Sequence, residues 1–397
     1  NIDDLHRRVM RGGYRAKPSR RRYIPKPDGR QRPLGIAALE DKVVQRAVVE
    51  VLNAIYETDF LGFSYGFRPG RSQHDALDAL AYGINLRQVN WIVDADIRSF
   101  FDRISHAWMM RFLEHRIGDR RVLRLVAKWL KAGVMEEGAW TEGVEGTPQG
   151  AVISPLLANI YLHYVYDLWV EQWRKRRATV EAIVIRYADD TVVGFQRHAD
   201  AERFLRDLRE RLATFGLALH PDKTRLIELG RFAAQRRSVK GLRKPETFDF
   251  LGFTHICAKQ RDGRFILLRQ TIAERMRAKL LEIKETLYRM CHLPVPEQGR
   301  WLGQVVRGYF AYHAVPTNSR RTTSCAYHVV WHWRRALMRR SQKASVPWRR
   351  MKLLAARWIP SARIRHPWPQ QRFLVQHPRW EPSALAAHAR ICPGGAG

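Results

Sequence analysis

The chain is poor in cysteine, with four among 397 residues, and no two of them form a Cys-x-x-Cys pair. This scarcity excludes a disulfide framework, argues against a zinc finger and suits a reducing compartment. The sequence also lacks an apolar run of the roughly 18 residues that a membrane span requires, and we expect no secretory signal. We therefore expect a cytoplasmic protein with no membrane partner.

Acidic residues are scarce relative to basic ones, 38 against 70, so the formal net charge is +32. Residues 271–397 hold 23 Lys and Arg against 5 Asp and Glu, together with seven of the 13 Trp. Such an excess predicts a polyanionic partner, RNA or DNA. Aromatic side chains among basic ones suit stacking on exposed nucleotides, and the alternative is a helical core with a solvated basic face. The two interpretations can hold on opposite faces of the same helices.

The hydrophobic pattern predicts an α+β fold, an antiparallel sheet backed by helices, followed by a helical region. Apolar residues recur at helical spacing over residues 39–56 and 200–216, and again in three segments beyond residue 271. Residues 89–97 and two short β-branched runs at 183–185 and 191–193 predict strands.

Two adjacent carboxylates, Asp189 and Asp190, lie in the tight turn expected between the two short strands. Like charges about 4 Å apart repel by about 4 kcal/mol at an effective dielectric of about 20. The turn is therefore either a solvated acidic turn or a site for divalent cations. Asp96 ends the strand at 89–97, and if these strands are neighbours the three carboxylates meet. Two Mg²⁺ ions held there would support in-line phosphoryl transfer, and the charge of the chain favours nucleotide polymerisation on a nucleic-acid template.

Two other features are open to more than one interpretation. Lys26 and Arg32 flank a Pro-Asp-Gly turn, so the segment is either an exposed basic hairpin or a grip for a triphosphate. His328 and His332 have the helical spacing of a metal pair, but no third ligand can be named, and we expect no metal there.

An ordered set of motifs surrounds these residues. It comprises Ile24-Pro-Lys-Pro-Asp-Gly29, Arg32-Pro-Leu-Gly-Ile36, Ser64-Tyr-Gly-Phe-Arg-Pro-Gly70, Asp96-Ile-Arg-Ser-Phe-Phe-Asp102, Gly146-Thr-Pro-Gln-Gly150, Tyr187-Ala-Asp-Asp190, His220-Pro-Asp-Lys-Thr224 and Phe250-Leu-Gly-Phe253. Each motif alone is weak, but their joint order and spacing resemble those of group II intron reverse transcriptase/maturases. The resemblance implies right-hand polymerase fingers and palm at residues 1–256 and a helical thumb/maturase domain at 257–355. A basic tail would follow at 356–397, with no endonuclease module.

The resemblance also implies a role for each matching residue. Asp96, Asp189 and Asp190 would bind two Mg²⁺ ions, and Lys223 would protonate the leaving pyrophosphate. The nucleotide would be bound by Lys26, Arg32, Phe101, Gln149 and Gly150, with Phe101 as the steric gate under the sugar. The primer grip would be Phe250, Leu251 and Gly252. Basic residues at the end of the third C-terminal helix, expected over about 324–340, are candidates for RNA binding: Arg334, Arg335, Arg339 and Arg340.

These implications combine into one expected function. The chain would be the RNA-directed DNA polymerase of a mobile group II intron that also binds its intron RNA and assists splicing. Its partners would be intron RNA, an RNA template with a DNA primer, deoxynucleoside triphosphates and target DNA. The alternatives are a non-enzymatic, RNA-binding splicing cofactor and a stand-alone, domesticated or defence-associated reverse transcriptase.

Overall fold

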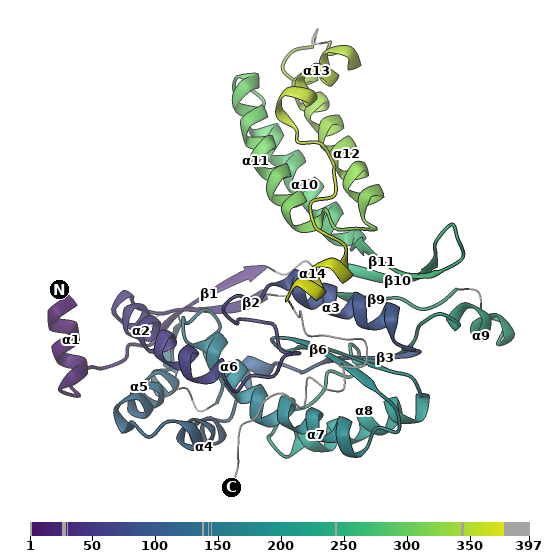
Figure 1. Ribbon diagram of the computed structural model, residues 1–397. Coiled ribbons are helices and arrows are strands. Elements are labelled where there is room, and N and C mark those ends of the chain that lie inside the picture. The colour runs from purple at the N-terminus through teal and green to yellow at the C-terminus, as the bar shows by residue number, and fades with distance from the viewer. Residues whose placement is uncertain are drawn as a thin grey trace. The chain divides into compact units, whose positions relative to one another are not determined.

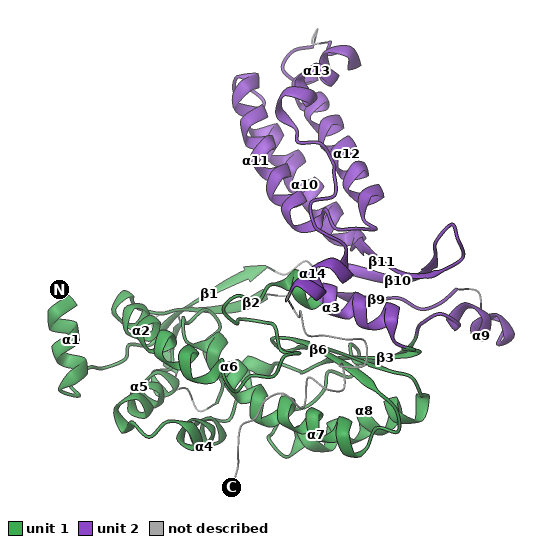
Figure 2. Ribbon diagram, viewed as in Figure 1, with its two compact units in different colours: residues 1–76, 88–228, 380–397 green, residues 77–87, 229–379 purple. Residues whose placement is uncertain are grey.

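The computed structural model describes residues 2–25, 29, 31–136, 139–141, 143, 145–242, 244–342 and 345–376. The chain forms two compact units, one from residues 1–76 and 88–228 and one from residues 77–87 and Leu229–Arg379 (Figure 2). The domain limits expected from the sequence stay a prediction.

The central sheet of the first unit has the strand order β6-β7-β3-β8, with every neighbouring pair antiparallel (Figure 1). Its strands are β3 (Trp91–Asp96), β6 (Ala182–Tyr187), β7 (Asp190–Phe195) and β8 (Arg225–Glu228). Strands β6 and β7 are buried along nearly their whole length, which explains their continuous apolar runs. The antiparallel sheet expected from the sequence is confirmed.

Helices pack against this sheet and against one another to build the core of the first unit. Helix α8 (His198–Ala213) lies on β3 and β7 and buries Ala201, Phe204, Leu208 and Leu212, which recur at helical spacing. The other helices of the unit are α1 (Ile2–Met10), α2 (Leu39–Tyr56), α4 (His106–Arg116), α5 (Arg120–Lys131), α6 (Ser154–Leu162) and α7 (Leu168–Arg176), with a 3₁₀ turn at Phe100–Asp102 and a π-helical turn at His163–Asp167.

A second sheet in this unit has the order β2-β1-β4-β5. Its strands are β1 (Ser19–Pro25), β2 (Gln31–Ile36), β4 (Val134–Glu136) and β5 (Ala139–Thr141). Strands β1 and β2 form an antiparallel hairpin, while β1 pairs with β4 in parallel. The hairpin predicted around the Pro-Asp-Gly turn is therefore confirmed by its two strands.

The second unit combines a small antiparallel sheet, β11-β10-β9, with a helical bundle. Its strands are β9 (Phe248–Phe250), β10 (Phe253–Lys259) and β11 (Phe265–Thr271). Its helices are α3 (Gln73–Leu86, which begins in the first unit), α9 (Ala233–Val239), α10 (Ala273–Arg289), α11 (Val295–His313), α12 (Ser319–Met338), α13 (Trp348–Trp358) and α14 (Pro369–Gln376). Among the described residues, no helix is both long and apolar enough to cross a membrane.

Trp333 on α12 is the largest fully buried side chain of the bundle core. Its Nε1 donates a hydrogen bond to Oε1 of Gln298 on α11 at 2.9 Å, so the one polar atom of the indole is satisfied. The ring and the hydrogen bond together join α12 to α11.

Replacing Trp333 with Ala should lower the free energy of unfolding of this unit by about 3–5 kcal/mol, because a large cavity replaces the ring. Tyr327→Ala on the same helix is the control, since Tyr327 is 58% exposed and its loss should cost under about 1 kcal/mol. Chemical denaturation followed by circular dichroism measures both. Equal losses for the two variants would contradict this account of the bundle core.

Candidate active site

The three carboxylates predicted from the sequence lie at one end of the β6-β7-β3-β8 sheet. Strand β3 ends at Asp96, whose ladder partner is Asp190, the first residue of β7. Asp189 precedes Asp190 in the two-residue turn that joins β6 to β7. The other turn residue, Ala188, has a φ of +56°, a left-handed conformation that is uncommon for residues other than Gly, Asn and Asp. The strands that carry these carboxylates are neighbours, which was the condition for the three carboxylates to meet.

The pKa of Asp189 is raised, first because burial disfavours its charged form. The negative charge of Asp96 raises the same pKa further, whereas Arg32 and Lys223 lower it. These electrostatic effects identify Asp96, Arg32 and Lys223 as the charged surroundings of Asp189. Because the charge of Asp96 disfavours the ionised form of Asp189, a cation bound beside them would favour that form.

Lys223 lies directly beside Asp96, with 2.5 Å between its Nζ and the Oδ2 of that carboxylate. The segment before β8 is fixed to β3 by the amide of His220, which donates to the main-chain oxygen of Asp96 at 2.8 Å. Two residues before Asp96 on β3, Oδ2 of Asp94 lies 3.8 Å from Nη2 of Arg225. The two carboxylates on this face of β3 thus have different cationic neighbours.

The donor set fits Mg²⁺, a hard cation that prefers carboxylate oxygens. Among the residues that the structure describes, no group of three or more His, Cys, Asp or Glu side chains is arranged to hold a metal ion by itself. In proteins Mg²⁺ is held by carboxylates together with substrate phosphates and water, and Asp96, Asp189 and Asp190 could supply the carboxylates. The expectation that His328 and His332 hold no metal stays a prediction.

The residues predicted to bind a nucleotide come from segments that contact one another. The amide of Gly35 on β2 donates to the main-chain oxygen of Gln149 at 2.6 Å. Gly150 has a φ of +108°, and a Cβ there would lie 3.0 Å from the oxygen of Gly35. The amide of Thr147 donates to the oxygen of Phe101 at 2.8 Å. Phe101, Gln149 and Gly150 therefore belong to one locally hydrogen-bonded region.

Arg32 is exposed on β2 opposite Ile24 of β1, while Lys26 lies outside the described residues. Two more cations, Arg20 and Arg22, are exposed at alternate positions of β1. Because side chains at alternate positions share a face of a strand, these two arginines form a row with Arg32. Arg20 and Arg22 were not among the predicted site residues, although their alternate positions in the sequence indicate a shared face of a strand.

The predicted primer-grip residues form the tight turn between β9 and β10 in the second unit. Leu251 and Gly252 have φ values of +45° and +83°, and Phe250 pairs with Phe253 across the turn. The hydroxyl of Tyr312 on α11 donates to the main-chain oxygen of Leu251 at 2.7 Å. The turn is thus fixed in shape by a helix of the bundle.

Two of the four arginines predicted to bind RNA already bond to the protein itself. Arg334 donates through Nε to the oxygen of Val346 at 2.7 Å, and Arg340 does the same to Cys291 at 2.7 Å. The guanidinium groups of the other two lie over aromatic rings, Arg335 over Trp331 at 4.7 Å and Arg339 over Tyr288 at 4.6 Å. Changes at Arg334 and Arg340 would therefore also affect the local structure.

A buried ion pair, which the sequence analysis missed, supports the acidic turn. Arg186 on β6 is fully buried, and its Nε and Nη2 donate to the carboxylate of Asp167 at 2.7 and 2.6 Å. Asp167 ends the π-helical turn and is also fully buried. The Nη1 of Arg186 donates to the main-chain oxygen of Ala188 at 2.9 Å. The guanidinium therefore fixes the backbone of the turn next to Asp189.

The same guanidinium reaches two further segments. It donates to Oγ of Ser64 at 2.7 Å and to Oδ1 of Asn159 at 3.1 Å, and Asn159 in turn donates to the oxygen of Gly66 at 2.6 Å. A Cβ at Gly66 would lie 2.3 Å from the nitrogen of Ala188, so only glycine fits under the turn. The sequence did contain a signal for this ion pair, an Arg inside an apolar strand, because a buried charge must be paired.

Comparison with known proteins agrees with this arrangement. The family model for reverse transcriptase (RNA-dependent DNA polymerase) matches residues 24–255, more than half of the chain. Protein YkfC of Escherichia coli is 35% identical over 277 residues, covering 60% of this chain and 72% of that protein.

Two relatives are proteins associated with introns. The group II intron-encoded protein LtrA of Lactococcus lactis is 40% identical over 181 residues, covering 45% of this chain and 30% of LtrA. An uncharacterised 91 kDa protein in the cob intron of Schizosaccharomyces pombe is 28% identical over 395 residues, covering 83% of this chain and 47% of that protein. The chain thus spans less than half of either intron relative. It belongs to the reverse transcriptase (RNA-dependent DNA polymerase) family, and its relatives include group II intron-encoded members.

Proposed function

We propose that Asp96, Asp189 and Asp190 hold two Mg²⁺ ions with which the chain polymerises deoxynucleotides on an RNA template. The observation that carries this proposal is the ladder pairing of Asp96 with Asp190, which brings the end of β3 beside the acidic turn. When bound, the ions supply positive charge at the attacking and leaving oxygens of nucleotidyl transfer. The protein supplies the oxygen ligands and, through the sheet, their fixed separation.

The nucleotide is held from the β1–β2 hairpin and the loop around Gln149. Lys26 and Arg32 bind the triphosphate as cations, and the effect of Arg32 on the pKa of Asp189 supports its nearness to the reacting phosphates. Gln149 and Gly150 lie along the nucleotide, where the absence of a Cβ in Gly150 permits close approach. Phe101 fills the space under the sugar that a 2′-hydroxyl would need.

Lys223 acts as the general acid that protonates the leaving pyrophosphate. Its contact of 2.5 Å with Asp96 supports a place beside the reacting atoms. An ammonium group is a suitable proton donor to an oxygen that becomes more basic as the bond to phosphorus breaks. The turn formed by Phe250, Leu251 and Gly252 holds the DNA primer.

The chain also binds intron RNA and assists its splicing, with the basic bundle as the contact surface. The names of the intron relatives and the excess charge beyond residue 270 support this partner. Substitutions at Arg335 and Arg339 test this surface more directly, because Arg334 and Arg340 also donate hydrogen bonds to main-chain oxygens of the protein. Target DNA is the further partner of a mobile intron, and we place the protein with nucleic acid in the cytoplasm.

Asp189→Asn should reduce primer extension on an RNA template by more than about a hundredfold, because the variant keeps the shape and loses a charged metal ligand. Asp94→Asn is the matched control: it removes a carboxylate on the same face of β3, two residues before Asp96, and should stay within about threefold of wild type. The rate of deoxynucleotide incorporation at saturating Mg²⁺ measures both. Wild-type rates for Asp189→Asn would contradict the assignment of the carboxylates.

Phe101→Ala should raise the incorporation of ribonucleotides relative to deoxynucleotides by about tenfold or more, because the 2′-hydroxyl gains room. The measurement is the ratio of kcat/KM for the two nucleotides. Its neighbour Phe100 is buried and faces the core, so Phe100→Leu should leave the ratio unchanged. An unaltered ratio in Phe101→Ala means that another residue excludes ribonucleotides.

Arg186→Met should lower the free energy of unfolding by about 3–5 kcal/mol, because Asp167 is left buried and unpaired. Adding Asp167→Leu removes that charge and should restore most of the stability. The double variant still lacks the bond to the oxygen of Ala188, so its primer extension should stay well below wild type. Denaturation and primer extension are measured on the same samples, and a stable double variant with wild-type activity would show that Arg186 has no positioning role.

A further inference from the structure

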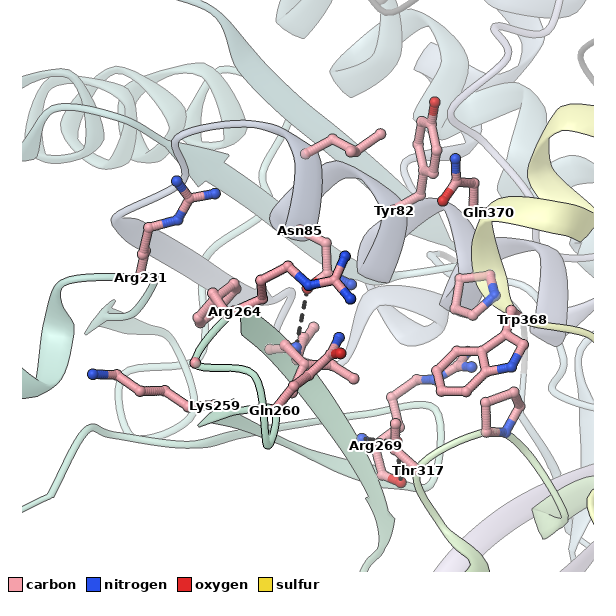
Figure 3. A pocket seen from close by; sticks show the side chains of 17 residues that line it. Tyr82, Asn85, Arg231, Lys259, Gln260, Arg264, Arg269, Thr317, Trp368 and Gln370 are labelled. Carbon is pink, nitrogen blue, oxygen red and sulfur yellow. Dashed lines mark hydrogen bonds between the residues drawn. The ribbon is translucent and has the colours of Figure 1, made fainter.

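A cavity of about 690 Å³ lies within the second unit (Figure 3). It is lined by the end of α3, the β10–β11 hairpin, the loop after α11 and the start of α14. Its volume falls within the range of small-molecule sites and is ample for one nucleotide. Among the described lining residues there is no Asp or Glu, while Arg231, Lys259, Arg264 and Arg269 are present.

Two of the four cations of the cavity, Arg231 and Lys259, lie at one side of it. In Figure 3 the side chains of Arg231 and Lys259 lie across the cavity from Trp368 and Gln370. Both cations are exposed, whereas Arg264 pairs with Asp262 at 2.7 Å. An exposed pair of cations at the mouth of a cavity without acidic lining attracts a phosphate group.

The floor of the cavity is rigid because its own polar groups are satisfied. Arg269 is buried and forms an ion pair with Asp78 at 2.5 Å, and Asp78 also meets Arg372 at 3.2 Å. The amide of Arg269 donates to Oγ1 of Thr317 at 2.9 Å. Asn85 accepts from the amide of Leu267 at 3.0 Å through its Oδ1, which leaves the NH₂ group of its side chain as a donor for a ligand.

The wall opposite the cations is aromatic. Trp368 is 52% exposed, and its amide donates to Oε1 of Gln371 at 3.2 Å at the start of α14. That helix is fixed to α3 by Tyr82, whose ring stacks on Phe373 with centroids 4.5 Å apart and an interplanar angle of 14°. An exposed indole on a fixed support is a suitable platform for a nucleobase.

We propose that this cavity binds one nucleotide of a single-stranded nucleic acid. The base stacks on Trp368, the flanking phosphates lie against Arg231 and Lys259, and the amides of Asn85 and Gln370 contact the base edge. This proposal depends on the proposed function in one respect only, namely that the partner is a nucleic acid. Its proposed chemistry differs from that of the carboxylates, because it requires neither a metal ion nor the making of a bond.

The test is binding of a fluorescent 12-nucleotide single-stranded RNA to the full chain, measured by anisotropy over a series of salt concentrations. Arg231→Gln with Lys259→Gln should weaken binding about tenfold and reduce the slope of log K against log salt, by about 0.7 for each phosphate that the variant no longer neutralises. The charge-matched control is Arg277→Gln with Lys279→Gln on α10 of the same unit, where both cations pair with neighbouring Glu. This control should leave most of the affinity intact.

Trp368→Ala should weaken binding several-fold without changing the salt slope, and Trp368→Phe should restore most of it, because stacking needs a flat ring rather than an indole. Equal affinities for wild type, the Arg231/Lys259 variant and Trp368→Ala would overturn the proposal. It would also be overturned if AMP or poly-glutamate displaced the RNA as effectively as an unlabelled 12-mer.

The polymerase assignment is tested separately on the same proteins. Asp189→Asn should bind the 12-mer as wild type does, while the Arg231/Lys259 variant should still extend a short annealed primer at high concentration. Loss of RNA binding at the cavity with intact primer extension supports the new site alone. If Asp189→Asn extends primers normally while the cavity variants lose RNA binding, the carboxylate assignment fails and the cavity site stands.

Discussion

The ion pair between Arg186 and Asp167 is the contact on which the geometry of the acidic turn depends. Both side chains are fully buried, so either charge without the other would cost several kcal/mol. The pair joins β6 to the π-helical turn, and Nη1 of Arg186 also donates to the oxygen of Ala188. Ala188, the left-handed residue of the two-residue turn, is thereby fixed beside Asp189.

Charged side chains of both signs surround Asp189 and act on its pKa in opposite directions. Burial raises the pKa of Asp189, Asp96 raises it further, and Arg32 and Lys223 act in the opposite direction. Since the ionised form is the metal ligand, acidification should weaken metal binding at a higher pH than for an ordinary Asp. Bound cations, Arg32 and Lys223 therefore all favour the ionised form of Asp189.

The strands and the meeting of Asp96 with Asp190 were predictable, because β-branched runs and the period of two appear in the sequence itself. Arg186 was visible only as a charge in an apolar strand, and its partner Asp167 belongs to a helical pattern that gives no hint of the contact. The cavity was beyond prediction, because Asn85 and Trp368 are far apart in the chain and only the fold brings them together. Likewise, helical spacing could not reveal that Arg334 and Arg340 bond to main-chain oxygens.

The central claim is that the buried pair holds the carboxylates ready for two divalent ions. Electron paramagnetic resonance of bound Mn²⁺, recorded with a primer–template and a non-hydrolysable deoxynucleotide, tests it most directly. We expect two Mn²⁺ ions per wild-type chain and fewer per chain of the Arg186→Met, Asp167→Leu double variant, which we expect to fold. Two ions per chain in that folded double variant would contradict a positioning role for the pair, and two ions in an Asp96→Asn, Asp189→Asn variant would contradict the assignment of the carboxylates.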